Sequence, residues 1–302
     1  KNSKQYECTF GTCGTKRLAM SNVDEVTSLL AKESKQDGVD FTEYDLNGAS
    51  INGASFIYAT FDKAQLENSE LTGINFSQAS LEGSSLKNST LTDIDFTGAK
   101  LAGVNFEETV FVNCNFKSVT AEHCELSSAN FKNCKLRGSN LNHSNFYSAI
   151  FEECDLSFSR LMYTYMKQVE ISKSKMKGAN ARGSDLSFSK INETDLSGVI
   201  LKYSDLSSCT FKGVKLSNAN LIGVDFKDAF CSEIQIDEAN FEGADLTYAN
   251  LEGSNLQNSF FLEANLHGTN FTNANLSDAY LVDANIAKAI TKGANLENTV
   301  LE

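Results

Sequence analysis

A strict period of five residues runs through most of this chain of 302 residues. From Phe41 to Leu301, 53 positions in steps of five carry large apolar residues almost throughout. The four exceptions are Ala121, Ala181, Cys231 and Thr291. A second column lies two residues before each of the 53 positions, and it holds Ala, Ser, Thr, Cys or Val with few exceptions. A period of five fits neither the 3.6 of an α-helix nor the 2.0 of a β-strand. The pattern therefore predicts a chain that turns a corner every five residues.

The glycines support this interpretation. All sixteen glycines after residue 39 lie two places after a position of the large apolar column. This location predicts a positive φ at that corner position, as at the third residue of a type II turn. Four five-residue segments would then close a square coil of twenty residues. The chain has no proline, which fits a stack of coils joined by backbone hydrogen bonds that proline cannot donate.

With this repeat, the sequence resembles the pentapeptide-repeat superfamily, whose consensus is Ala, Asp or Asn, Leu, and two variable residues. Three consecutive matches are Ala239–Gly243, Ala244–Tyr248 and Ala249–Gly253. The resemblance covers residues 39–302 and implies an all-β solenoid, a right-handed quadrilateral β-helix. At four segments per coil, the chain would form about thirteen coils and a rod roughly 60 Å long.

Residues 1–38 differ from the repeats and are expected to form a separate N-terminal segment. Asn22 and Glu25 have the spacing of a capping box, and Val23, Val26, Leu29 and Leu30 lie on one helical face. We expect a short amphipathic helix over about residues 22–35 that covers the open edge of the first coil, because bare edges invite aggregation.

Candidate groups for chemistry are few. Cys114, Cys134 and Cys154 lie in the small column and are spaced by twenty residues. His123 and His143 lie at a corner and are also twenty residues apart. A metal or redox site is conceivable at each group, but we favour a packing role for the cysteines and simple surface exposure for the histidines. Cys8 and Cys13 could form a small disulfide loop. We expect no catalytic residue, no metal and no cofactor, and we therefore expect that the protein is not an enzyme.

Charge is segregated along the sequence. The net charge of −13 argues against direct binding of nucleic acid, and no apolar run is long enough for a membrane span. Residues 131–190 form a basic belt, with ten Lys or Arg against five acids. Between Lys227 and Lys288 there is no Lys or Arg. That stretch holds the residues of a predicted acidic face: Asp228, Glu233, Asp237, Glu238, Glu242, Asp245, Glu252, Glu263, Asp278 and Asp283.

Outward apolar residues gather on one side of the predicted coil. Phe260, Tyr280 and Val300 are spaced by twenty, as are Leu262 and Val282, so they would form a stripe over the last three coils. Monomers seldom expose such stripes. The predicted partner or dimer interface comprises Met162, Tyr163, Tyr203, Ile222, Phe260, Leu262, Tyr280, Val282 and Val300.

These features predict a non-catalytic rod or scaffold that binds another protein, with a homodimer through the C-terminal coils as one form of that binding. One alternative comes from the resemblance to the quinolone-resistance branch of the family, whose acidic rods mimic DNA and bind type II topoisomerase (gyrase). The basic belt departs from that branch. Another alternative is a targeting module of a larger bacterial effector, since Leu301 is still in register at the end of the sequence. A cytoplasmic location is favoured over that of a secreted effector.

Overall fold

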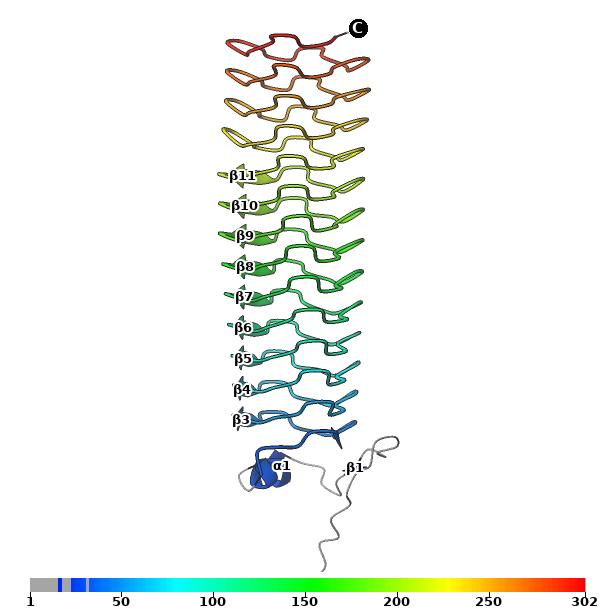
Figure 1. Ribbon diagram of the computed structural model, residues 1–302, viewed down its shortest axis with the longest axis vertical. Helices are drawn as coiled ribbons and strands as arrows, with labels where there is room; N and C mark the ends of the chain where they lie inside the picture. Colours follow the sequence, from blue (N-terminus) through cyan, green and yellow to red (C-terminus); the bar gives the residue numbers. More distant parts are fainter. Residues whose placement is uncertain (1–15, 18–22, 31–32, 302) are drawn as a thin grey trace, which may run out of the picture.

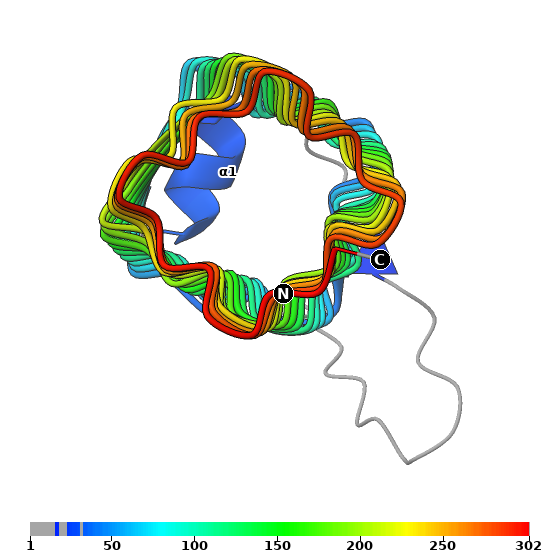
Figure 2. The same ribbon diagram turned by 90° about the horizontal axis from the view of Figure 1, so that it is seen from above.

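The structure, a computed structural model, describes residues 16–17, 23–30 and 33–301. From Ser34 onward the chain winds into a straight, four-sided stack of coils (Figures 1 and 2). Parallel bridges join residues twenty apart, from Lys35 with Ser55 to Tyr280 with Val300. The prediction of an all-β solenoid is therefore confirmed.

The four sides of each coil are named here by the large apolar residue at their centre. Side 1 contains the central residues 41, 61, 81 and so on to 301, and side 2 contains 46, 66 and so on to 286. Side 3 contains 51, 71 and so on to 291, and side 4 contains 36, 56 and so on to 296. Because the bridges join residues twenty apart, each side is a straight column along the rod.

Regular strands occur on side 3. The strands β3 to β11 form one parallel ladder in which each strand pairs with the strand twenty residues on. They comprise β3 (Ser50–Asn52), β4 (Glu70–Thr72), β5 (Thr90–Thr92), β6 (Val110–Val112), β7 (Asn130–Lys132), β8 (Ile150–Glu152), β9 (Glu170–Ser172), β10 (Lys190–Asn192) and β11 (Thr210–Lys212). The ladder has nine strands and therefore spans fewer coils than the thirteen predicted for the rod. Beyond β11, isolated bridges replace strands on side 3. There Asn250 and Asn270 accept hydrogen bonds from the backbone two residues on and tighten the corner.

Backbone hydrogen bonds join successive coils and close the corners. The Phe41 amide donates to the Thr60 carbonyl at 2.7 Å, and the Thr60 amide donates back to the Val39 carbonyl at 3.0 Å. At a typical corner, the Ala49 amide donates to the Leu46 carbonyl at 3.1 Å, and Gly48 has a φ of 72°. This is the predicted type II turn.

The interior is filled by the large apolar column, whose rings stack along the axis. On side 4, the ring centroids of Phe56 and Phe76 are 5.4 Å apart, and those of Phe76 and Phe96 are 5.5 Å apart. The small inward column also forms hydrogen bonds that the five-residue pattern does not reveal. Ser89 Oγ donates to the Leu66 carbonyl at 2.8 Å. Its hydroxyl thereby links one coil to the coil before it.

The N-terminal segment covers the first coil with two elements. Helix α1 (Val23–Leu30) lies across the N-terminal end of the stack (Figures 1 and 2) and buries Val26 in the core. Strand β1 (Lys16–Arg17) pairs in parallel with β2 (Val39–Asp40) at the same end. The predicted cap residue Asn22 and the side chains of Glu25 and Leu29 lie outside the described part of the chain.

The predicted end of the helix, near residue 35, is wrong. Helix α1 ends at Leu30, and Lys35 already bridges to Ser55. The repeat register begins one segment earlier than predicted, at Gln36, which occupies a central position of side 4 and is buried. Its side chain donates to the Glu33 carbonyl at 2.9 Å. The register was missed because a polar residue stands where the pattern requires a large apolar one.

Candidate protein-binding surface

The apolar stripe lies on side 1 of the last coils. We define the stripe as Phe260, Leu262, Tyr280, Val282 and Val300. Phe260 is 45% exposed and Tyr280 is 46% exposed, and their rings stack with centroids 5.2 Å apart. Bridges join residues 260, 280 and 300 in succession. The structure therefore places the predicted stripe residues side by side on one flat surface.

The other predicted interface residues form a second group on the same side. Met162, Tyr163, Tyr203 and Ile222 lie several coils before the stripe, and the polar Asn240 and Glu242 separate the two groups. Tyr163 and Tyr203 are each 53% exposed. Cations lie beside Tyr203, because the Arg182 guanidinium carbon lies 5.5 Å and Lys202 Nζ lies 4.8 Å from its ring centroid. The single interface predicted from the sequence is thus divided into two surfaces of different character.

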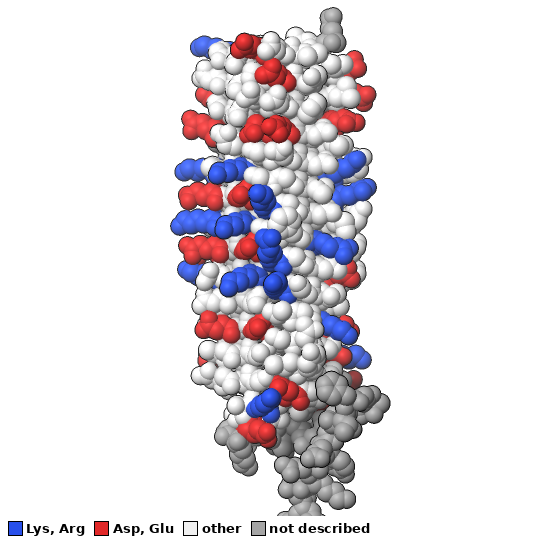
Figure 3. Space-filling view, viewed as in Figure 1, with Lys and Arg blue, Asp and Glu red and all other residues white. Residues whose placement is uncertain are grey.

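The predicted acidic face is not one face. Its ten residues lie on all four sides, so they form a collar around the last coils. Glu242, Glu263 and Asp283 lie on side 1, Asp228 and Asp245 on side 2, Glu233 and Glu252 on side 3, and Asp237, Glu238 and Asp278 on side 4. The prediction treated a stretch of sequence as a surface, whereas each coil distributes its residues around the rod. In Figure 3, basic side chains gather on the middle coils of the visible face.

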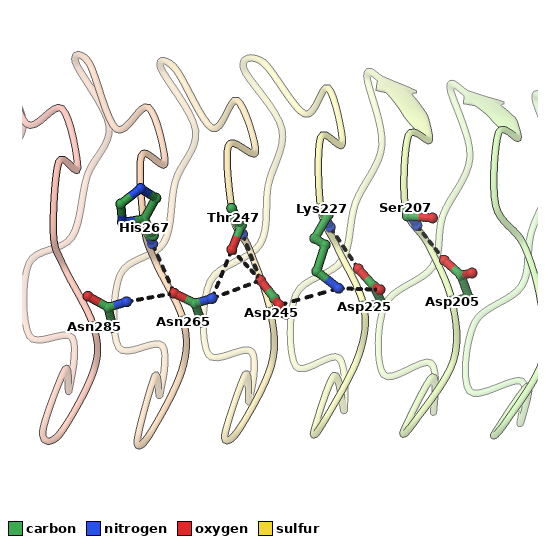
Figure 4. A network of polar contacts seen from close by, with 9 residues as sticks. All are labelled: Asp205, Ser207, Asp225, Lys227, Asp245, Thr247, Asn265, His267 and Asn285. Carbon is green, nitrogen blue, oxygen red and sulfur yellow. Dashed lines mark hydrogen bonds and ion pairs between the residues drawn. The ribbon is translucent and has the colours of Figure 1, made fainter.

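Some acids of the collar are already engaged within the protein. Figure 4 shows a polar network on side 2 that joins Asp225, Lys227 and Asp245. Lys227 Nζ lies 2.7 Å from Asp225 Oδ2 and 3.3 Å from Asp245 Oδ2. Partial burial would raise the pKa of Asp245, but hydrogen bonds from Thr247 and the charge of Lys227 outweigh it and leave that pKa below its ordinary value. Asp245 therefore stays ionised to hold successive coils together.

The histidine pair is unsuited to binding one metal ion. The rings of His123 and His143 stack with centroids 5.0 Å apart and planes 9° apart. The nitrogen lone pairs lie in the ring planes, so two stacked rings direct them along parallel planes rather than toward a common point. Among the residues that the structure describes, no group of three or more His, Cys, Asp or Glu could hold a metal.

The cysteines of the small column are buried and free. Cys124 Sγ lies 3.0 Å from the Leu101 carbonyl and Cys209 Sγ lies 3.0 Å from the Leu186 carbonyl, the same link between coils that serine makes. Burial raises the pKa of Cys124 to about 12 and that of Cys209 to about 12. The thiols of Cys124 and Cys209 therefore stay protonated at neutral pH, which disfavours metal or redox chemistry at these two positions. Cys8 and Cys13 lie outside the described residues.

A hollow of about 440 Å³ lies at the corner between sides 2 and 3. It is lined by Ser148, Ile150, Gln168, Glu170, Phe188 and Lys190. Its two charges neutralise each other, since Lys190 Nζ lies 2.8 Å from Glu170 Oε1. The hollow thus offers no unpaired charge to orient a ligand.

Comparison with known families accounts for the repeat. The family described as pentapeptide repeats (8 copies) matches residues 37–73, 61–98 and 89–127. The family described as pentapeptide repeat region matches residues 124–201 and 215–290. The chain belongs to the pentapeptide-repeat family. The family membership that the resemblance implied is therefore confirmed.

Solved structures of other pentapeptide-repeat proteins resemble this chain. One is HetL from the cyanobacterium Nostoc sp. strain PCC 7120, involved in heterocyst differentiation regulation, with 22% identity over 93% of this chain and 98% of HetL, and a TM-score of 0.27. Another is full-length QnrB1, a plasmid-mediated fluoroquinolone resistance protein, with 23% identity over 77% of this chain and 91% of QnrB1, and a TM-score of 0.24. A third, from the Arabidopsis thaliana thylakoid lumen, has 28% identity over 32% of this chain and 68% of its own, and a TM-score of 0.32.

No curated protein matches the chain. None of the helices in the described ranges has the length and apolar character needed to cross a membrane.

Proposed function

We propose that this pentapeptide-repeat chain is a non-catalytic, protein-binding rod whose contact surface is the stripe on side 1. The observation that carries the proposal is the exposed, stacked pair Phe260 and Tyr280, continuous with Leu262, Val282 and Val300. Aromatic rings held rigidly on a flat surface lose little conformational entropy on binding and supply large apolar contact area.

A second copy of the chain is the partner that the stripe fits. The stripe is centred on residue 280, so two antiparallel copies would place Phe260 of each against Val300 of the other. Such a pairing buries the same patch on both copies, as a two-fold interface requires. The acids Glu263 and Asp283 flank the stripe, and Asp283 of each copy would approach Asp283 of the other. Salt should therefore strengthen the dimer by screening this repulsion.

Charged substitutions in the stripe test the proposal. Phe260→Glu with Tyr280→Glu would bury unpaired carboxylates at the contact and should dissociate the dimer. Sedimentation equilibrium should give twice the 33.0 kDa chain mass for the wild type and the single mass for this variant. The matched control is Phe230→Glu with Tyr248→Glu, which changes two rings exposed to 50% and 57% on sides 3 and 2. The control should stay dimeric, and its dissociation would point to net charge instead of the stripe.

A gyrase binder that mimics DNA is a second candidate, favoured by the acidic collar. Of the ten acids in this collar, seven are exposed and three are half-buried. Binding through them would weaken steeply with salt and would be lost when the exposed Glu238 and Glu252 are changed to Gln. Gyrase supercoiling that stays unchanged at high protein concentration would rule out this candidate.

A further inference from the structure

The basic belt is concentrated on two adjacent sides of the rod. Over the middle coils, from Lys117 to Tyr203, sides 4 and 1 carry eight Lys or Arg and three acids, whereas sides 2 and 3 carry four Lys or Arg and six acids. We define the basic patch as six residues of sides 4 and 1: Arg137, Arg160, Lys175, Lys177, Arg182 and Lys202. The fold thus converts a belt in the sequence into a patch on the surface.

The cations of the basic patch have no carboxylate within ion-pair distance in the described part of the rod. In residues 33–301, none of the six takes part in an ion pair. On side 3, by contrast, Lys132 and Lys190 pair with Glu152 and Glu170. The basic patch therefore keeps its charge available for a partner, while the bases of side 3 are largely neutralised.

Exposed rings hold some of these cations in place. The Arg137 guanidinium carbon lies 4.6 Å from the Phe158 ring centroid, and Lys202 Nζ lies 4.8 Å from that of Tyr203. Such contacts favour one position of a long side chain. The cations are therefore partly ordered before a partner arrives, which reduces the entropy that binding would cost.

The same rings offer little free face for a nucleobase. The Phe158 ring has Arg137 over it from the coil before, and packs on Gly178 in the coil after, where an added Cβ would lie 2.8 Å from the ring. The Tyr203 ring likewise has the Arg182 guanidinium carbon 5.5 Å from its centroid, and a Cβ added to Gly223 would lie 2.5 Å from the ring. Single-stranded nucleic acids bind by stacking bases on open rings. Carboxylates need only cations and the positive edges of rings.

We propose that the basic patch is a docking surface for an acidic segment of a polypeptide. The patch is distinct from the stripe and lies on the middle coils, so it does not depend on dimer formation. Unpaired guanidinium and ammonium groups, spaced along flat coils about 4.8 Å apart, match an extended chain rich in Asp and Glu.

Fluorescence anisotropy with a labelled polyglutamate peptide tests this proposal on the full chain. The wild type should bind the peptide at low salt and release it at high salt. Arg160→Glu with Arg182→Glu should weaken binding by about tenfold or more. The control, Lys132→Glu with Lys190→Glu, makes the same change in net charge on side 3 and should retain binding within about twofold.

Three results would overturn the proposal. Absence of binding by the wild type at low salt would remove the docking surface, and equal losses in both variants would show that only net charge matters. A labelled oligothymidylate of equal charge that binds as tightly as the peptide would identify a nucleic-acid surface instead. The stripe variant Phe260→Glu with Tyr280→Glu should bind the peptide normally, which separates this proposal from the proposed dimer.

Discussion

At the residue scale, the corners show a dependence between coils that the five-residue pattern does not reveal. Gly223 has a φ of 62°, and a Cβ built on it would lie 2.5 Å from the Tyr203 ring of the coil before. Gly243 has the same φ at the same corner one coil on, with nothing within 4 Å. The sequence predicts the positive φ of both glycines. It does not show which glycine also makes room for a ring.

This difference gives a matched pair of substitutions. Gly243→Ala carries only the backbone strain of a positive φ and should lower the free energy of unfolding by about 1 kcal/mol. Gly223→Ala must also displace the Tyr203 ring and should cost about 1 kcal/mol more. Chemical denaturation of the two variants measures the difference. Equal losses would mean that the ring moves away freely.

At the element scale, the sequence predicts regular coils well and their first boundary poorly. The large apolar column specifies each coil independently, so one exception such as Ala121 leaves the register intact. The N-terminal boundary depends on Gln36, whose burial is compensated by a hydrogen bond to the Glu33 carbonyl. Hydrogen bonding of this kind cannot be read from hydrophobic periodicity. The pairing of β1 with β2 was missed for a similar reason, since two residues carry no periodic signal.

Helix α1 should protect the end of the stack through Val26, which is 1% exposed. Val26→Asp would bury a carboxylate with no partner and should lower the free energy of unfolding by about 2–4 kcal/mol. Loss of the helix would also expose the first coil and increase light scattering through edge-to-edge association. Ser28→Asp, at an exposed position of the same helix, is the control. Similar stability of the two variants would contradict a capping role for α1.

At the scale of the whole molecule, the coil decides which surface each charge belongs to. The sequence correctly suggested that apolar residues 260, 280 and 300 would adjoin, because their spacing equals one coil. It was wrong about the acidic face, because consecutive acids such as Glu238, Glu242 and Asp245 lie on different sides. The basic belt was predicted, but the sides of the rod that carry its unpaired cations were not. Five of the six residues of the basic patch lie within residues 131–190, and their lack of ion pairs appears only in the folded rod.

The rod is proposed to bind protein, first of all a second copy, through the apolar stripe on side 1. Sedimentation equilibrium of the wild-type chain over a series of salt concentrations tests this binding. We expect twice the 33.0 kDa chain mass, with association that persists or strengthens as salt rises, because burial of apolar surface drives it and acids flank the contact. A single-chain mass at every salt concentration, or a dimer that salt dissociates, would contradict it.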